Sequence, residues 1–158
     1  MKILKIAGCF VLIVIILILG IDFYLLKIYK DPVLSSIPEY YDKVFYEGGS
    51  GRGFTDYGKY YYKDEIDFKD NEYFKRVTEE DILSLKEYEA IYRQFAEKEY
   101  FKADYDFNMD LADTSDYIYI ANKDNKESYG IYKNIFDAFD IYFFDSRSKT
   151  LYFMHSNI

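Results

Sequence analysis

His155, the chain's one histidine, is the side chain best suited to acid–base chemistry. It ends the predicted strand Thr150–His155, which pairs with Asp140–Asp145 across residues 146–149, a hairpin length. Counting outward from that turn places Asp140 opposite His155, where a carboxylate could orient the imidazole as a general base. No serine motif accompanies this pair, and the only cysteine lies in an apolar N-terminal run. We therefore expect a cross-strand contact and assign no catalytic residue.

Oxygen-bearing side chains alternate along one acidic segment, in the way that begins a calcium-binding loop. The pattern departs from such a loop at two positions. Met109 replaces the glycine of the sharp turn, and Ser115 replaces the glutamate that binds the ion through both oxygens. We therefore assign no metal ligand and expect a solvated turn with Tyr105 and Phe107 facing inward. The alternating side chains are those of Asp104, Asp106, Asn108 and Asp110.

The glycine-rich stretch 48–53 (GGSGRG) is a candidate phosphate site, because glycines let backbone N–H groups turn toward an anion. It lacks the Lys-Ser or Lys-Thr pair of a P-loop, and Phe54 interrupts the spacing of a dinucleotide fingerprint. No helix is predicted directly after it. We expect a surface loop and assign no cofactor.

An apolar run near the N-terminus predicts a membrane anchor, residues 1–30. The run 6–21 (IAGCFVLIVIILILGI) carries no charge, and 21 residues separate Lys5 from Lys27. At about 1.5 Å per residue, a helix of this length spans about 30 Å, the thickness of a hydrocarbon core. We therefore predict a single transmembrane helix over about 6–26.

Two other interpretations of this run are weaker. A cleaved signal peptide needs a small-residue cleavage site, and the run ends in LGIDFYLLK without one. The residues before Cys9 resemble a lipoprotein cleavage box, but the apolar stretch follows that box instead of preceding it.

Lys2 and Lys5 favour a cytoplasmic N-terminus, so we expect the domain that follows to lie outside the cytoplasm.

The remainder reads as a connector, 31–38, and one soluble acidic domain, 39–158. The clearest element is a helix over 79–99, with Thr78 as N-cap and Asp81 completing a capping box. Its apolar residues recur at spacings of three and four, which gives one face that must pack against something. These residues are Ile82, Leu85, Tyr88, Ile91, Tyr92 and Phe95.

The last third of the chain is typical of β-structure. Besides the C-terminal hairpin, residues 117–121 (YIYIA) alternate tyrosine and isoleucine. Earlier in the chain, residues 57–63 (YGKYYYK) are also strand-like, because they are rich in aromatic residues. Both faces of the hairpin are apolar, which indicates central strands. A helix followed by strands without regular alternation predicts an α+β fold, with a long helix packed on an antiparallel sheet that ends in this hairpin.

Charge is the property that bears most directly on function. The chain carries −8, and residues 1–30 contribute +3 through four lysines and one aspartate, so the remainder carries −11. Such a domain repels nucleic acid and attracts basic partners. We expect a membrane-anchored, non-catalytic interaction domain that binds a basic protein or peptide, in the manner of an immunity protein or an accessory subunit.

Tyr117 and Tyr119 are the candidate partner-binding residues, because they share one face of their strand and tyrosine is enriched where partners dock. The competing interpretation buries both rings under a neighbouring loop or helix. Two other functions stay open: an enzyme of the cell envelope that uses carboxylates, and a subunit of a membrane assembly. The domain's 27 acidic residues make chance carboxylate pairs inevitable, so composition alone does not identify an active site.

Overall fold

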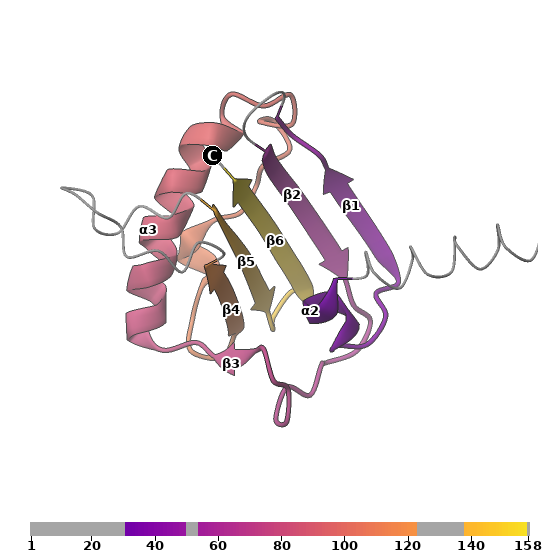
Figure 1. Cartoon of the computed structure of the whole chain (residues 1–158). Coiled ribbons are helices and arrows are strands. Elements are labelled where there is room, and N and C mark those ends of the chain that lie inside the picture. The colour runs from indigo at the N-terminus through magenta and orange to yellow at the C-terminus, as the bar shows by residue number, and fades with distance from the viewer. Residues whose placement is uncertain (1–30, 50–53, 123–137, 158) are drawn as a thin grey trace, which may run out of the picture. The chain divides into compact units, whose positions relative to one another are not determined.

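The computed structural model describes residues 31–49, 54–122 and 138–157 (Figure 1). The chain divides into two compact units, Met1–Ser36 and Ile37–Ile158, which are described separately. The predicted membrane helix, 6–26, lies outside the described residues, as do Ser50–Gly53 of the glycine-rich stretch. No helix within the three described ranges is long and apolar enough to cross a bilayer.

The described part of the first unit contains one short helix, α2 (Pro32–Ser35). The predicted connector is therefore partly helical. Pro32 occupies the first turn, where its missing N–H costs nothing, and Asp31 caps the helix. The Asp31 carboxylate accepts hydrogen bonds from the backbone N–H groups of Val33 and Leu34.

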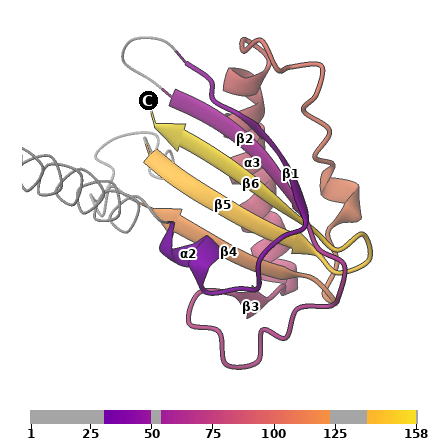
Figure 2. The ribbon, with the colours of Figure 1, turned by 90° about the vertical axis from the view of Figure 1, so that its right-hand side faces the viewer.

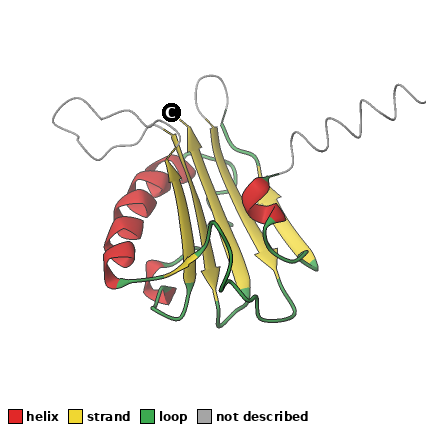
Figure 3. Ribbon diagram, turned by 60° about the horizontal axis from the view of Figure 1, so that its bottom comes forward, coloured by secondary structure: helices red, strands yellow, loops and turns green. Residues whose placement is uncertain are grey.

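The second unit is an α+β domain, in which one long helix packs on a six-stranded antiparallel sheet (Figures 2 and 3). The strand order is β1-β2-β6-β5-β4-β3. The strands are β1 (Asp42–Tyr46), β2 (Phe54–Tyr61), β3 (Lys75–Arg76), β4 (Tyr117–Asn122), β5 (Ala138–Asp145) and β6 (Thr150–Asn157).

The C-terminal hairpin has the predicted register. Asp145 pairs with Thr150, and Asp140 pairs with His155. Strands β5 and β6 occupy the two central places of the sheet, as their apolar faces predicted. Almost every residue of the two strands is buried, because layers of side chains cover both faces of the sheet here.

The long helix, α3 (Glu79–Ala96), begins where its cap predicted. The side chain of Thr78 accepts the N–H of Asp81, and the Asp81 carboxylate accepts the N–H of Thr78. Leu85 and Tyr92 are fully buried, so the predicted apolar stripe faces the sheet. The helix ends three residues before the predicted end, and a short 3-10 helix, η1 (Met109–Leu111), follows further along the chain.

The two faces of the sheet are covered differently. Helix α3 covers one face, over a core cluster that includes Tyr57, Ile141, Phe143 and Met154. The segment 62–74 packs on the other face through aromatic rings. Within this segment, the ring of Phe68 lies tilted against the ring of Phe144, with centroids 5.2 Å apart.

Candidate functional site

The alternating residues of β4 take the faces that the sequence predicted. Ile118 is 1% exposed in the core cluster, and Ile120 packs against the same cluster. Tyr117 and Tyr119 pair with Phe144 and Tyr142, which places both tyrosines on the face away from α3. Both tyrosines are half-buried.

The two tyrosines differ in what covers them. The ring of Tyr117 stacks on Phe68, with centroids 4.4 Å apart, so the segment 62–74 covers it. Tyr119 lies further along β4, where Tyr73 meets its ring edge-on at 5.3 Å. Of the pair, therefore, Tyr117 is a packing residue, and Tyr119 is the one that borders open space.

That open space is a pocket of about 410 Å³ beside β4. Its walls come from three parts of the chain: the segment through β3, the first half of α3, and β4 itself. Five of the eight lining residues are aromatic or aliphatic, and three are polar: Lys75 on β3, with Asp81 and Ser84 on α3. The lining residues are Tyr73, Lys75, Asp81, Ser84, Tyr88, Ile118, Tyr119 and Ile120.

The same region contains an edge of the sheet with backbone groups that no described strand pairs. Strand β3 pairs with β4 only at Lys75–Ile118 and Arg76–Tyr117. Before β3 the chain turns, because the Asn71 side chain accepts the N–H groups of both Tyr73 and Phe74. In the described ranges, the outer side of residues 119–122 therefore has no strand beside it. Such an edge can template the addition of another strand.

Charges at the pocket are balanced. Lys75 Nζ lies 2.6 Å from Asp81 Oδ1, so the two charged lining residues neutralise each other. Burial raises the pKa of Asp81, but the hydrogen bonds from Lys75 and Thr78 outweigh it and hold that pKa below its usual value. Burial, with the nearby Glu87 carboxylate, raises the pKa of Tyr88 to about 12, so its hydroxyl stays protonated at neutral pH. The pocket therefore suits an apolar side chain better than a charged one.

The histidine makes the contact that the register predicted. His155 Nδ1 lies 2.6 Å from Asp140 Oδ1. On the other side of His155, Asp56 is its register partner on β2. The row Asp56, His155 and Asp140 thus crosses three adjacent strands on the face away from α3. Burial raises the pKa of Asp56, partly offset by the Gly48 N–H that its carboxylate accepts and by His155. The row gives a charge-assisted cross-strand contact.

The acidic segment is organised by a lysine. Asp106 accepts hydrogen bonds from Lys59 Nζ at 2.8 Å and from Tyr57 Oη at 2.7 Å. Asn108 caps η1 by accepting the N–H of Asp110. Phe107 is buried in the core cluster, with Tyr105 packed against it, so the expected inward side chains are confirmed. In the described part of the chain, no group of three His, Cys, Asp or Glu residues is placed to hold a metal ion.

Paired carboxylates of raised pKa would favour an enzyme, and two carboxyls have raised pKa values. They are Asp56 and Asp116, each mainly because it is buried. Asp116 accepts the N–H groups of Asp113 and Ser146, which fastens the β5–β6 turn to the start of β4. Neither carboxyl lines the pocket beside Tyr119.

Sequence reasoning missed most of the pocket. Tyr73 and Lys75 stand in a segment without periodicity, and only their packing beside Tyr119 brings them into the site. The sequence predicted Tyr88 as part of the apolar face of the helix. Tyr88 lines the pocket because, beside that part of the helix, the sheet ends at β4. No local signal in the sequence carries this information.

No family model, curated protein or solved structure matches the chain.

Proposed function

We propose that residues 37–158 form a non-catalytic interaction domain that captures an extended segment of a basic protein along the outer edge of β4. This proposal rests on one observation: among the described residues, an unpaired strand edge lies beside a pocket whose walls include aromatic and aliphatic side chains. The edge offers backbone hydrogen bonds, and the pocket bordered by Tyr119 accepts one apolar side chain of the added strand.

The charge of the domain supports a basic partner. Residues 31–158 carry −11, and the helix beside the pocket begins with three acidic residues, Glu79, Glu80 and Asp81. Asp81 is paired with Lys75, whereas Glu79 and Glu80 are exposed. Lysine or arginine residues that flank the apolar side chain would meet this acidic turn. Charge of this kind speeds association and makes binding sensitive to salt.

The apolar N-terminal run supports attachment to a membrane. In this proposal residues 6–26 span the bilayer, the N-terminus is cytoplasmic, and the domain lies outside the cytoplasm. The full chain should remain in the membrane fraction after alkaline carbonate washing, at unprocessed mass. Cys9→Ser should behave identically, because the helix and not a lipid holds the chain. Release of Cys9→Ser from the membrane would contradict this part of the proposal.

The binding proposal is tested by selecting peptides from a random display library against the full chain in detergent micelles. Selected sequences should carry an apolar residue flanked by lysine or arginine, and their affinity should fall as salt rises. Tyr119→Ala should weaken the selected peptides about tenfold, because it removes one wall of the pocket.

The matched control is Tyr100→Ala, which removes a tyrosine that is 70% exposed and lines no part of this pocket. It should leave affinity within about twofold, since exposed rings outside a contact contribute little. Selection of acidic peptides, or equal binding by wild type and Tyr119→Ala at unchanged melting temperature, would overturn the proposal.

A further inference from the structure

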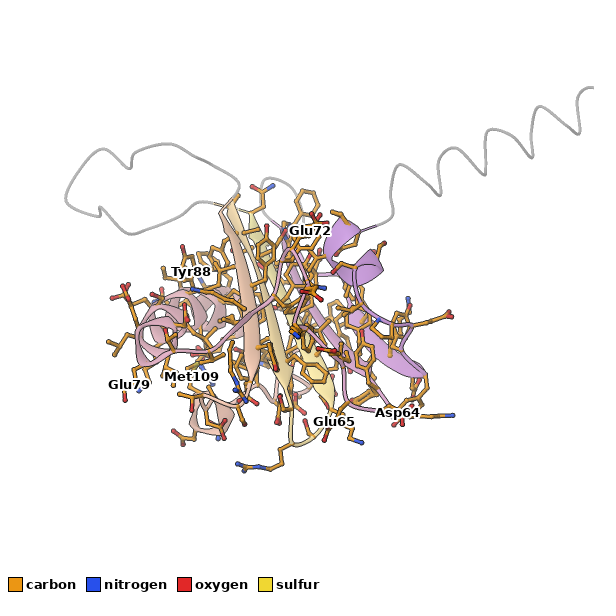
Figure 4. The ribbon with its side chains drawn as sticks, turned by 90° about the horizontal axis from the view of Figure 1, so that it is seen from below. Asp64, Glu65, Glu72, Glu79, Tyr88 and Met109 are labelled. Carbon is orange, nitrogen blue, oxygen red and sulfur yellow. The ribbon has the colours of Figure 1, made fainter. Side chains whose placement is uncertain are left out.

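A second pocket, of about 380 Å³, lies where β1 begins and β2 ends. It shares no lining residue with the pocket beside Tyr119. Figure 4 labels two of its residues, Asp64 and Glu65, beside the end of the sheet that carries β1 and β2. The lining residues are Pro38, Glu39, Tyr40, Tyr41, Tyr62, Lys63, Asp64, Glu65 and Ile66.

This pocket is acidic. Three carboxylates line it, from Glu39, Asp64 and Glu65, against the one ammonium of Lys63. All three acidic residues are exposed, so their charges act at the mouth of the pocket. A ligand that enters would therefore gain by carrying positive charge.

The tyrosine rings here already hold cations of the chain itself. Lys63 Nζ lies 5.5 Å from the centre of the Tyr41 ring, and Lys43 Nζ lies 5.7 Å from the centre of the Tyr40 ring. Both distances are within the range of a cation–π interaction. Tyr41 is 58% exposed, so its ring is also open to a cation that comes from outside.

Tyr62 adds an unused hydrogen-bonding group. It is 6% exposed, it lines the pocket, and its buried hydroxyl has no hydrogen-bond partner among the residues that the structure describes. Burial raises the pKa of Tyr62 well above its usual range, so the hydroxyl keeps its proton and offers oxygen lone pairs as acceptors. A buried hydroxyl left without a partner is uncommon, and a ligand that supplies a donor would satisfy it.

We propose that this pocket binds the guanidinium group of an arginine side chain from a basic peptide. A guanidinium is planar and weakly hydrated, so it stacks on a tyrosine ring while its N–H groups reach two acceptors in different directions. In this pocket the ring is that of Tyr41. The acceptors are the hydroxyl of Tyr62 and the carboxylates at the mouth. The site does not depend on the edge of β4, so the two proposals succeed or fail separately.

The test uses the full chain in detergent micelles and fluorescein-labelled tetra-arginine, with binding followed by anisotropy. Tetra-citrulline, which keeps the shape and loses the charge, should bind at least about tenfold more weakly. Glu39→Gln with Glu65→Gln should weaken tetra-arginine about tenfold. Tyr62→Phe, which removes only the hydroxyl, should weaken it about threefold.

A matched control separates the pocket from the net charge of the domain. Glu72→Gln with Glu97→Gln removes the same charge from two exposed positions that line neither this pocket nor the pocket beside Tyr119. This control should change affinity by less than about twofold. Lys63→Ala should strengthen binding about threefold, because it removes a like charge and frees the ring of Tyr41.

Three results would overturn the proposal: equal binding of tetra-citrulline, an equal loss in the two paired variants, or full binding by Glu39→Gln with Glu65→Gln. Tyr119→Ala should leave tetra-arginine binding unchanged. Loss of peptide capture in Tyr119→Ala with intact tetra-arginine binding would support both sites. The reverse result, intact capture of the selected peptides with no tetra-arginine binding, would refute the arginine pocket and support only the binding site at the β4 edge.

Discussion

The hydroxyl of Tyr105 donates a 2.7 Å hydrogen bond to Oε1 of Glu89, a carboxylate that is 6% exposed on the inward side of α3. Arg93, one turn later, donates to the same carboxylate and lies over the Tyr105 ring at 5.2 Å. The three side chains form one polar cluster, buried at Glu89 and exposed at Arg93, that fastens the helix to the segment before η1.

Removal of this carboxylate should destabilise the domain. Glu89→Ala leaves the Tyr105 hydroxyl with only a weak acceptor, Met154 Sδ at 3.8 Å, at a cost of roughly 1–3 kcal/mol in the free energy of unfolding. Glu89→Gln should lose less, because its amide oxygen still accepts from Tyr105. Urea unfolding followed by circular dichroism measures both. Glu87→Ala, an exposed acid on the same helix, is the control and should stay within about 0.5 kcal/mol of wild type.

Phe143 is the strongest test of the core. It is fully buried at the centre of the sheet, where Phe107 meets it edge-on with ring centroids 5.4 Å apart. Phe143→Ala should lower the free energy of unfolding by roughly 3 kcal/mol or more. Tyr41→Ala, at an exposed position near β1, should cost less than about 1 kcal/mol. A loss below about 1 kcal/mol for Phe143→Ala would contradict the observed burial of this ring.

Asp106 should make the domain sensitive to acid. Burial raises its pKa, but the hydrogen bonds from Lys59 and Tyr57 outweigh burial and hold that pKa below its ordinary 3.8. The folded state therefore retains the charge at a pH where the unfolded chain takes up a proton. The stabilisation is present above about pH 4 and is lost as pH falls through the lower, folded pKa.

Asp106→Asn removes this contribution. Near neutral pH the variant should be less stable than wild type, and the difference should shrink as pH falls from about 4 toward 2. Urea unfolding at a series of pH values measures it. A difference that grows on acidification would mean that the carboxylate does not gain from its two partners.

Two glycines in and beside the β1–β2 hairpin should respond differently to alanine. A Cβ at Gly48 would collide with the backbone carbonyl oxygen of Thr55, which cannot move without breaking the pairing around it. A Cβ at Gly58 would meet the side chain of Phe45 at 2.9 Å, and that ring is partly exposed. Gly48→Ala should cost roughly 1–3 kcal/mol and Gly58→Ala less. Thermal unfolding of the two variants gives the order, and a reversed order would contradict this geometry.

Local patterns predicted the elements whose determinants are neighbours in the chain. The capping box of Thr78 and Asp81 needs only residues three apart, and the hairpin register needs only a four-residue turn and alternating side chains. Both are confirmed. The position of Asp140 opposite His155 followed from the same counting, so this cross-strand contact could be predicted without a structure.

Long-range choices could not be predicted in this way. The buried Glu89 carboxylate has its hydrogen-bond donor in Tyr105, sixteen residues further along the chain. Strand β3 exists only through its two pairs with β4, about forty residues away. The acidic segment resembled a calcium loop by spacing, but the side chain that organises Asp106 is Lys59 from a distant strand. Each of these partners comes from another element, and the spacing within one segment does not identify it.

The position of β6 has a consequence for how the chain is made. Strand β6 lies between β2 and β5, so residues roughly ninety positions apart, Tyr61 and Thr150, become neighbours. A ribosome adds about 5–20 residues per second, so β2 waits roughly 5–20 s for its partner. During that interval the edge of β2 that will receive β6, with its row of tyrosines, has no partner strand. Until β6 is made, this edge of β2 can pair with a wrong strand, so we expect a chaperone that covers it to improve folding.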